Sequence, residues 1–336
     1  MTSTWRTPGL LVLLLLCLLG AAVLSLGTGP VSIPLASVLD ALLGAPTEGP
    51  TLTIVRDIRL PRLVLALLVG AALAVAGTAM QGFFQNPMAD PYIVGVSSGA
   101  ALGATVGMVF RIDFWVAGLS AIPVLAFSGA LGATFLVYAL SLRGGRVPVG
   151  LLLLTGVAVG ALAAAATSLL MILGDEDTRL ILFWLLGSLS SRRWEHVQMI
   201  TPYVGIGVAL IWVYARDLNL LLLGEETAQH TGVEVERVKR IVLSASALLA
   251  AAAVSVSGII GFVGLLVPHL MRLIVGPDHR RLIPASALMG ALLLCLADTL
   301  ARTLASPSEI PIGIITSALG CPFFLFLVAR RRDVAL

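Results

Sequence analysis

The chain carries few charges for its length. Aspartate, glutamate, lysine and arginine make up 12% of its 336 residues, whereas soluble domains average about 25%. Hydrophobic residues make up 58%, and the mean hydropathy is +1.03. Several apolar runs exceed the roughly 20 residues that an α-helix needs to cross a bilayer. The shortage of charge therefore excludes an ordinary soluble domain and predicts an all-α polytopic membrane protein.

Lysine is almost missing, and this excludes one kind of nucleotide site. The single lysine, Lys239, follows Val238, whereas a phosphate-binding P-loop needs the sequence Gly-Lys-Ser/Thr. The sequence also lacks the HExxH and GxSxG patterns, so we expect no catalytic residues and no enzyme. The arginines are scattered singly in loops without a basic face, so nucleic acid is not an expected partner.

Cysteine and histidine are too few and too scattered to predict a metal site. Cys17, Cys295 and Cys321 lie in apolar runs without a CxxC spacing, so we expect buried thiols. His269 has no second ligand at helical spacing. Capping or packing at a helix break made by Pro268 is favoured over metal ligation.

The apolar runs predict about ten membrane-spanning helices. The first run could be a cleaved signal, but the many runs that follow favour its retention as the first helix. A further run, 180–189, is too short to cross and is expected to lie at the surface or to dip part-way into the bilayer. The predicted spans are 10–27, 62–84, 93–110, 116–141, 147–173, 195–215, 241–261, 264–276, 282–304 and 310–329.

Basic residues in the short loops predict the orientation, because they collect on the cytoplasmic side. With the N-terminus inside, the inner segments hold most of them, so we expect both termini inside. The inner residues are Arg6, Arg143, Arg146, Arg216, Arg237, Lys239, Arg240, Arg272, Arg280, Arg281 and Arg330–Arg332. The outer residues are Arg56, Arg59, Arg62, Arg111, Arg179, Arg192, Arg193 and Arg302.

A weak internal repeat is visible. Arg59-Leu-Pro-Arg62 opens the second span and Arg237-Val-Lys-Arg240 opens the seventh, and each span then runs through alanine-rich sequence to a glycine. The two copies enter from opposite faces and lie five spans apart, which predicts a five-plus-five inverted repeat. Chance similarity between two arginine-headed apolar helices stays open as the alternative.

One polar segment, residues 216–240, interrupts the apolar chain and must lie outside the bilayer core. A short helix is expected to start at Glu225, after Gly224, with Gly232 at its C-terminal cap. We interpret the segment as the docking site of a soluble partner that supplies energy. An ordinary solvated loop is the alternative. The acidic residues of this segment are Asp217, Glu225, Glu226, Glu234 and Glu236.

Asp298 is the one carboxylate deep in a predicted span, and such a residue is a candidate for proton coupling. Arg302 lies four residues later, on the same helical face. We favour a local ion pair between them over a proton relay.

Several motifs of the chain resemble those of the permease subunits of bacterial ABC importers for ferric siderophores, haem and vitamin B12. They occur in the family's order from about residue 50 to the C-terminus, so we treat residues 1–336 as one permease domain. The motifs are Arg59-Leu-Pro-Arg62, Gln81-Gly-Phe-Phe-Gln-Asn86-Pro-Met-Ala-Asp90-Pro-Tyr-Ile-Val-Gly95-Val-Ser-Ser-Gly99-Ala, Gly224-Glu-Glu-Thr-Ala, Gly261-Phe-Val-Gly-Leu-Leu-Val-Pro-His269-Leu-Met-Arg272 and Glu309-Ile-Pro-Ile-Gly313.

The resemblance implies a set of partners in a bacterial cytoplasmic (inner) membrane. A second permease copy would form a homodimer, or a similar chain a heterodimer, with one pathway on the two-fold axis. Two cytoplasmic ATPase subunits would carry the ATP and Mg, which leaves no cofactor on this chain. They would dock on residues 216–240, and a periplasmic binding protein would deliver the cargo. The implied coupling residues are Gly224, Glu225, Glu226, Thr227 and Ala228, with Gly232 at the end of the coupling helix.

The resemblance also implies docking and gating residues. Arg59, Arg62 and Arg302 would receive acidic residues of the binding protein and are expected to be exposed on the outer rim. Contact with lipid headgroups is the alternative for the first two. The cytoplasmic gates would involve Asn86 and Met88, and then Val149 and Gly150. The vitamin B12 permease has hydroxyl residues at the second gate and this sequence does not, which leaves that gate in doubt and points to a different cargo.

We therefore expect an ATP-driven importer of a ferric siderophore, haem or cobalamin-type chelate. A proton-coupled secondary transporter centred on Asp298 is the alternative function. A membrane-embedded enzyme is disfavoured, because no nucleophile or metal constellation is visible. The sequence does not specify the cargo, since leucine, alanine, glycine and serine offer no cargo-specific chemistry.

Overall fold

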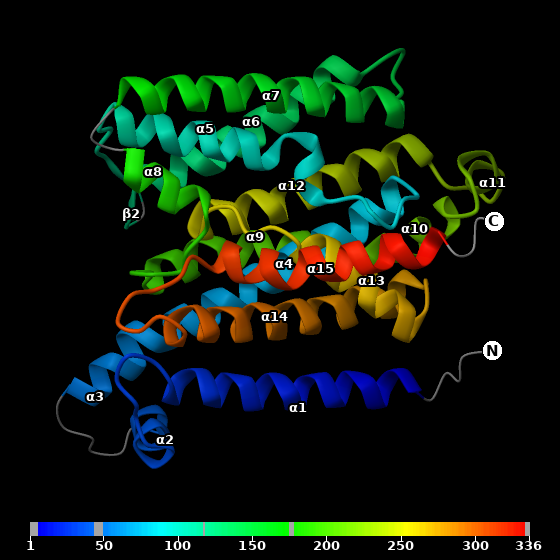
Figure 1. Ribbon diagram of the computed structural model, residues 1–336. Coiled ribbons are helices and arrows are strands. Elements are labelled where there is room, and N and C mark those ends of the chain that lie inside the picture. Colours follow the sequence, from blue (N-terminus) through cyan, green and yellow to red (C-terminus); the bar gives the residue numbers. More distant parts are fainter. Residues whose placement is uncertain (1–5, 44–49, 117, 175–177, 333–336) are drawn as a thin grey trace.

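The computed structural model describes residues 6–43, 50–116, 118–174 and 178–332. Most of its long helices run side by side along one direction and form a single bundle (Figure 1). The long helices are α1 (Arg6–Gly27), α4 (Leu60–Phe83), α5 (Val96–Val109), α6 (Ala121–Ser141), α7 (Val149–Leu173), α9 (Trp194–Val213), α12 (Val235–Ser257), α13 (Val263–Val275), α14 (His279–Thr303) and α15 (Ile312–Arg332). The shorter elements are α2 (Leu35–Leu43), α3 (Pro50–Thr53), η1 (Ile54–Arg59), η2 (Pro91–Val94), α8 (Thr178–Leu185), α10 (Ala215–Leu221), α11 (Glu225–His230) and the two-stranded hairpin β1 (Trp115–Val116) and β2 (Leu119–Ser120).

Each of the ten predicted spans contains one helix. Among the described residues, 7 helices are long and apolar enough to cross a membrane, judged by length and composition. The helices of the other three spans are shorter apolar segments, Val96–Val109, Val263–Val275 and Ile312–Phe326. The structure thus supports a helical multi-pass membrane protein, while the number of crossings stays a prediction.

The two arginine-headed helices of the repeat form the centre of the bundle. In both α4 and α12, 78% of the apolar window is buried. Figure 1 shows them running in opposite directions between the two ends of the bundle. Opposite entry agrees with the predicted inverted repeat, which itself stays a prediction.

Small residues allow the central helices to approach each other closely. A Cβ atom on Gly77 of α4 would lie 1.8 Å from the carbonyl oxygen of Gly264 in α13. A Cβ on Gly70 would lie 2.2 Å from the carbonyl oxygen of Gly290 in α14. These distances permit only glycine, and close backbone contact of this kind drives helix association where lipid removes the usual hydrophobic force.

The predicted helix break at Pro268 is wrong. Helix α13 continues through this residue, although proline cannot donate to the carbonyl four positions earlier. That carbonyl belongs to Gly264, whose oxygen lies against Gly77 of α4. Helix α13 therefore packs closely on α4 at the position of this carbonyl. By contrast, Pro91 lies at the start of η2 and Pro148 immediately before α7.

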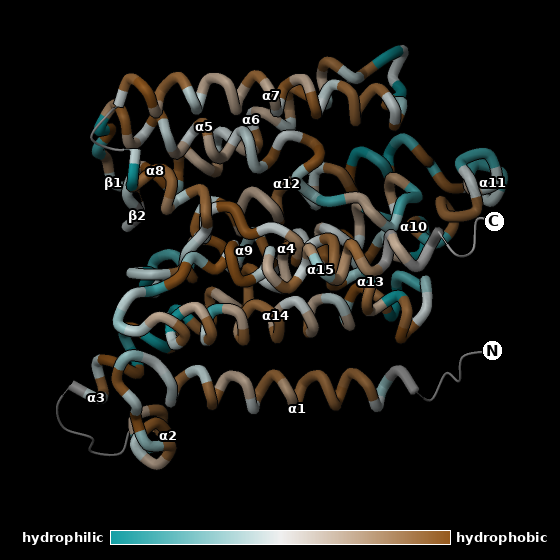
Figure 2. The backbone as a smooth tube through the Cα atoms, in the orientation of Figure 1, coloured by the Kyte–Doolittle hydropathy of each residue, from teal (hydrophilic) through white to brown (hydrophobic). Residues whose placement is uncertain are grey.

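The outer helices present apolar side chains to their surroundings. Leu16 of α1 is 61% exposed, and Leu154 and Ile172 of α7 are 68% and 76% exposed. Figure 2 shows hydrophobic colouring along α1 and α7 and hydrophilic colouring around α11. This surface suits lipid contact. It also explains why the predicted burial of cysteine thiols is confirmed only for Cys295, while Cys17 is exposed.

Helix α8 lies at one end of the bundle, and its expected place at the membrane surface stays a prediction. The chain that follows it meets the ends of two other helices. The amide of Ser188 donates to the carbonyl of Ser257 at 2.7 Å, and the amide of Ile312 donates to that of Gly187 at 2.9 Å. A Cβ on Gly313 would lie 2.4 Å from the carbonyl oxygen of Leu186, so this junction explains why the Glu309–Gly313 motif ends in glycine.

Candidate functional site

The predicted short helix of the polar segment is confirmed in detail. Helix α11 begins at Glu225 and ends at His230. Gly232 has a φ of 89°, a left-handed conformation that suits glycine. The amide of Gly232 donates to the carbonyl of Gln229 at 2.9 Å, and the amide of Val233 donates to that of Ala228 at 3.1 Å. Together these bonds form a Schellman cap.

One face of α11 is buried and the other is open. Ala228 is fully buried, whereas Glu226 and Thr227 are exposed. Figure 1 places α11 at the end of the bundle where α1 begins and α15 ends. The open face therefore projects away from the bundle, in the position that a soluble partner requires.

The structure gives different roles to two adjacent glutamates that the sequence does not distinguish. Glu225 lies 2.6 Å from the ammonium of Lys239 in α12, and that lysine side chain is 6% exposed. Glu226 makes no hydrogen bond or ion pair with any described residue. One glutamate therefore attaches α11 to α12, and the other points outward.

Helix α10 anchors the polar segment to the bundle through contacts that the sequence analysis missed. The amide of the Gln85 side chain, just after α4, donates to the carbonyl of Leu221 at 2.6 Å. Asn219 donates from Nδ2 to Asp278 at 2.6 Å and accepts from the backbone amide of His279 at 2.8 Å. These partners are far apart in the sequence, so no local pattern indicates them.

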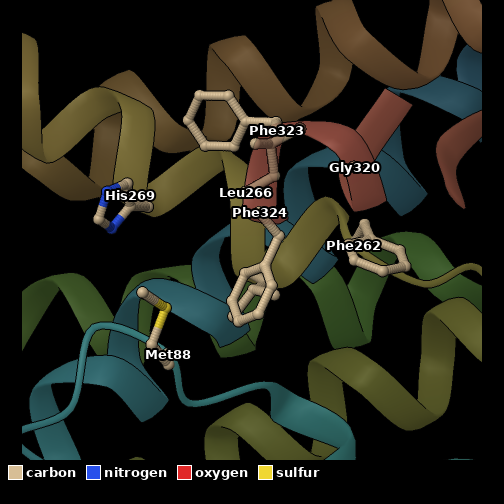
Figure 3. A pocket seen from close by; sticks show the side chains of 8 residues that line it. Met88, Phe262, Leu266, His269, Gly320, Phe323 and Phe324 are labelled. Atoms are coloured by element: carbon tan, nitrogen blue, oxygen red, sulfur yellow. The ribbon is translucent and has the colours of Figure 1, made fainter. Parts of the chain in front are cut away.

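The first predicted gate segment is an ordered turn. The Oδ1 atom of Asn86 accepts from the amide of Met88 at 2.9 Å, which is the geometry of an Asx turn. Figure 3 shows the Met88 side chain in a small apolar pocket, close to Phe324 of α15. The pocket is lined by Met88, Phe262, Leu265, Leu266, His269, Gly320, Phe323 and Phe324. The turn thus presents one apolar side chain to α13 and α15.

A half-buried carboxyl follows this turn. Asp90 caps η2 by accepting from the amide of Tyr92 at 2.8 Å. Burial raises the pKa of the Asp90 carboxyl to about 6. The phenol of Tyr92 donates to the carbonyl of Ile260 at 3.0 Å, and burial raises its pKa as well. These bonds tie the gate segment to the backbone between α12 and α13.

The second predicted gate lies at the start of α7. Val149 packs against the main hydrophobic core, and Gly150 is exposed, with open space where a Cβ would lie. Among the described residues, no hydrogen bond or ion pair joins Asn86 or Met88 to this position.

A buried ionic cluster lies at the opposite end of the bundle. Asp298 of α14 is 1% exposed and lies 2.9 Å from Arg62 of α4. The predicted pair with Arg302 is confirmed, at 3.1 Å. Arg62 also binds Glu309 at 2.8 Å. A buried carboxylate needs such partners, because an unpaired charge in the interior is costly. The bonds to Arg62 were not visible in the sequence.

The expected exposure of the three docking arginines is wrong. Arg59, Arg62 and Arg302 are 6%, 7% and 4% exposed. Arg62 binds carboxylates, Arg59 binds backbone carbonyls, and Arg302 binds both. Arg59 donates to the carbonyl of Leu26 at 2.6 Å and also to that of Val31. The arginines thus fasten the segment after α1 to α4 and α14, and their docking role stays a prediction.

An open groove follows α15 from the junction at its start. Leu185 and Ile259 line it on one side, and Gly313, Ser317 and Cys321 line it on the other. The groove is mostly apolar, and its polar groups include the serine hydroxyl and the thiol.

In the described part of the chain, no group of three or more His, Cys, Asp or Glu side chains is placed to hold a metal ion. His269, the candidate weighed from the sequence, packs the edge of its ring on Phe323 at a centroid distance of 6.4 Å. This packing agrees with the role that the sequence favoured for it.

These features define the class of the protein as a multi-pass helical membrane protein, with the polar helices α10 and α11 at one end of the bundle. Comparisons with known proteins agree. The FecCD transport family matches residues 14–330. The cobalamin import system permease protein of Halobacterium salinarum is 50% identical over 283 residues, covering 84% of this chain and 75% of the relative. The hemin transport system permease protein of Yersinia pestis is 47% identical, covering 82% of this chain and 83% of the relative.

Two further relatives cover almost the whole chain. The ferric dicitrate transport system permease protein of Escherichia coli is 39% identical, covering 96% of this chain and 99% of the relative. A solved structure, reported as an inward-facing conformation of a presumed metal-chelate type ABC transporter, matches with a TM-score of 0.85 and 35% identity. The match covers 96% of this chain and 99% of the chain in the solved structure. The chain therefore belongs to the FecCD transport family, whose permeases serve ABC importers of iron chelates, haem and vitamin B12.

Proposed function

We propose that this chain is the membrane-spanning permease of an importer driven by ATP hydrolysis on separate cytoplasmic subunits. Two copies would form one pathway. A binding protein outside the cytoplasmic membrane would deliver a chelate of the ferric siderophore, haem or cobalamin class. The family and the names of the relatives support this class of cargo, and no residue described above selects one member of it.

The observation that carries the proposal is the α10–α11 segment. It projects from one end of the bundle, exposes Glu226 and Thr227, and is anchored to the bundle through Gln85, Asn219 and Lys239. A rigidly anchored polar surface is what a soluble motor needs in order to move membrane helices. The sequence contains no P-loop of its own, so the energy would come from that partner.

The proposed topology has ten crossings, with both termini and α11 on the cytoplasmic side. The start of α1, the end of α15 and α11 lie at the same end of the bundle (Figure 1). The antiparallel course of α4 and α12 is what a five-plus-five inverted repeat requires. Three of the ten helices are short for a crossing, and in the dimer their ends would line the pathway or be buried in protein.

We place the cargo pathway along the groove beside α15. Its open side would face the second copy, so that two grooves enclose the axis of the dimer. The loop that carries Met88 closes on the inner end of α15 next to Phe324 (Figure 3). That position suits a cytoplasmic gate, with Val149 and Gly150 of the partner copy as the second candidate constriction.

Contact between a binding protein and the three buried arginines would require a conformational change around them. Arg59, Arg62 and Arg302 are buried and bonded within the chain. An acidic residue of the delivery protein would reach them only when the segment after α1 moves aside. Docking would then exchange an internal carbonyl or carboxylate for one on the partner.

The alternative, a proton-coupled transporter centred on Asp298, is less well supported. The carboxylate of Asp298 is held by Arg62 at 2.9 Å and by Arg302 at 3.1 Å. This arrangement gives Asp298 a structural role without any proton transfer. A purely structural role of the cluster therefore accounts for its burial and its partners.

Uptake into proteoliposomes separates these functions. The permease would be reconstituted with its ATPase subunits and binding protein and supplied in turn with ferric dicitrate, haemin and cyanocobalamin. We expect uptake of one of these that requires ATP and is unchanged when the pH gradient is collapsed. Uptake that follows the pH gradient in the absence of ATPase subunits would contradict the proposal.

A further inference from the structure

The single lysine of the chain lies between two carboxylates from different helices. Lys239, one turn into α12, is 5% exposed. Its Nζ atom lies 2.6 Å from Glu225 of α11 and 3.6 Å from Glu236 of α12. Because the ammonium is shielded from water, these interactions are screened less than an ion pair at the surface.

The contacts continue from α12 to the segment before α7. The second carboxylate oxygen of Glu236 accepts from the backbone amide of Val147 at 3.2 Å. Val147 is itself buried and lies two residues before Val149, at the start of α7. An unbroken series of polar contacts therefore runs from α11, through Lys239 and Glu236, to the second candidate gate.

Glycines with positive φ flank helix α11 at both of its ends. Gly224 has a φ of 103° and Gly232 a φ of 89°, and each has open space where a Cβ would lie. The Ala228 side chain packs inward, so the bond from Glu225 to Lys239 is the polar attachment of α11 to α12. A displacement of α11 would therefore reach α12 through this ion pair together with the packing of Ala228.

A neighbouring ion pair provides a comparison, because it lies on the surface and does not connect two helices. Glu234 and Arg237 lie 3.6 Å apart, with side chains that are 73% and 63% exposed. Exposed pairs of this kind contribute little, because water and salt screen them. This pair also bonds to no other element among the described residues, which makes it a natural control.

We infer that Lys239 is a positioning residue that transmits displacement of α11 to the segment before α7, and that Glu225 is an internal strut rather than a docking contact. This inference rests on the proposed function, since it assumes that a cytoplasmic ATPase moves α11. Coupling then travels through a contiguous set of contacts with a defined order: Glu225, Lys239, Glu236 and the amide of Val147.

The test compares deuterium exchange of the permease–ATPase complex with and without ATP and Mg, and it needs no cargo. In the wild-type complex, we expect the ATPase subunits to protect α11, and ATP to change the exchange rate of residues 143–150. In Lys239→Met, the protection of α11 should remain. The ATP-dependent change at 143–150 should shrink by about fivefold or more, the lower end of usual coupling factors.

Two further variants keep the test decisive if Lys239→Met does not fold. Glu225→Gln removes the charge of a side chain that is 42% exposed and should give the same loss. Glu234→Gln should behave as wild type. Combining Glu225→Gln with Lys239→Met should be no worse than the second change alone, because both break one connection.

Different results would contradict the proposed function and the relay, meaning the series of contacts from Glu225 through Lys239 and Glu236 to Val147. An ATP-dependent change at 143–150 that persists in Lys239→Met or Glu225→Gln, with α11 still protected, would overturn the relay and leave the proposed function intact. A wild-type chain in which ATPase subunits give no protection of α11 would overturn the proposed function itself. A loss of thermal stability in the variants without any loss of this change would show that Lys239 is only structural.

Discussion

The guanidinium of Arg62 in α4 and the carboxylate of Asp298 in α14 lie 2.9 Å apart, although 236 positions separate them in the chain. The pair joins the first arginine-headed helix to α14 at the end of the bundle opposite α11. Arg302 is a second partner at 3.1 Å, so the carboxylate of Asp298 is paired within the protein. The cluster therefore fixes the packing of the central helices.

Asp298→Asn tests whether this cluster is structural. The change leaves two buried guanidiniums short of a carboxylate, and breaking a buried pair in this way costs about 3–5 kcal/mol. We expect a large fall in the thermal unfolding midpoint in detergent, and any folded fraction should still show ATP-dependent uptake. Wild-type stability combined with lost uptake would contradict this account and favour a proton-transfer role.

Gly77→Ala tests the close contact between α4 and α13. The new methyl group would lie 1.8 Å from the carbonyl oxygen of Gly264, so the two helices must separate. Overpacking of this kind costs about 1–3 kcal/mol. Gly205→Ala in α9 is the matched control, because no atom lies within 4 Å of its new Cβ. Equal unfolding midpoints for the two variants would show that the helices do not approach as described.

Asp90→Asn tests the half-buried carboxyl beside the first gate. Its pKa of about 6 lies above the ordinary value of 3.8, so between these pH values the folded chain holds a proton that the unfolded chain has lost. The free energy of unfolding due to this group therefore falls as the pH rises from about 4 to about 6, and is constant above that range.

Asparagine keeps an oxygen that can accept from the amide of Tyr92 but carries no charge. The variant should therefore lose this part of the pH dependence and be more stable than wild type at neutral pH. Unfolding midpoints in detergent across this pH range measure the difference. Parallel curves for the two proteins would show that the Asp90 carboxyl is not the titrating group.

Glu226→Lys tests the outward face of α11. The side chain is exposed and makes no bond to a described residue, so the fold should be unaffected. Reversing a charge at a docking surface slows association and weakens it. We expect the affinity for the ATPase subunits to fall by about tenfold, or about 1.4 kcal/mol. Equal affinity of Glu226→Lys and the wild-type chain for the ATPase subunits would place the docking surface elsewhere.

The sequence predicts best what depends on neighbouring residues. The cap at Gly232 follows from the rules for a helix end, and the pair of Asp298 with Arg302 follows from a spacing of four residues in one helix. The apolar runs similarly locate a helix in each predicted span. These features are confirmed because local geometry determines them.

Features that depend on how helices pack were missed or predicted wrongly. The bond from Arg62 to Asp298 exists because α4 lies against α14, and the same packing buries the arginines that were expected at the surface. The different roles of Glu225 and Glu226 depend on which face of α11 meets α12. A local rule also failed at Pro268, where α13 continues through the proline while packed closely on α4.

The central claim is that the chain is driven from the cytoplasmic side through α11. Labelling of Thr227→Cys with a membrane-impermeant maleimide tests it most directly, in a background where the exposed Cys17 and Cys321 are changed to alanine. The account predicts labelling in inverted membrane vesicles, loss of that labelling when the ATPase subunits are bound, and none in right-side-out vesicles. Labelling from the outer face would contradict it.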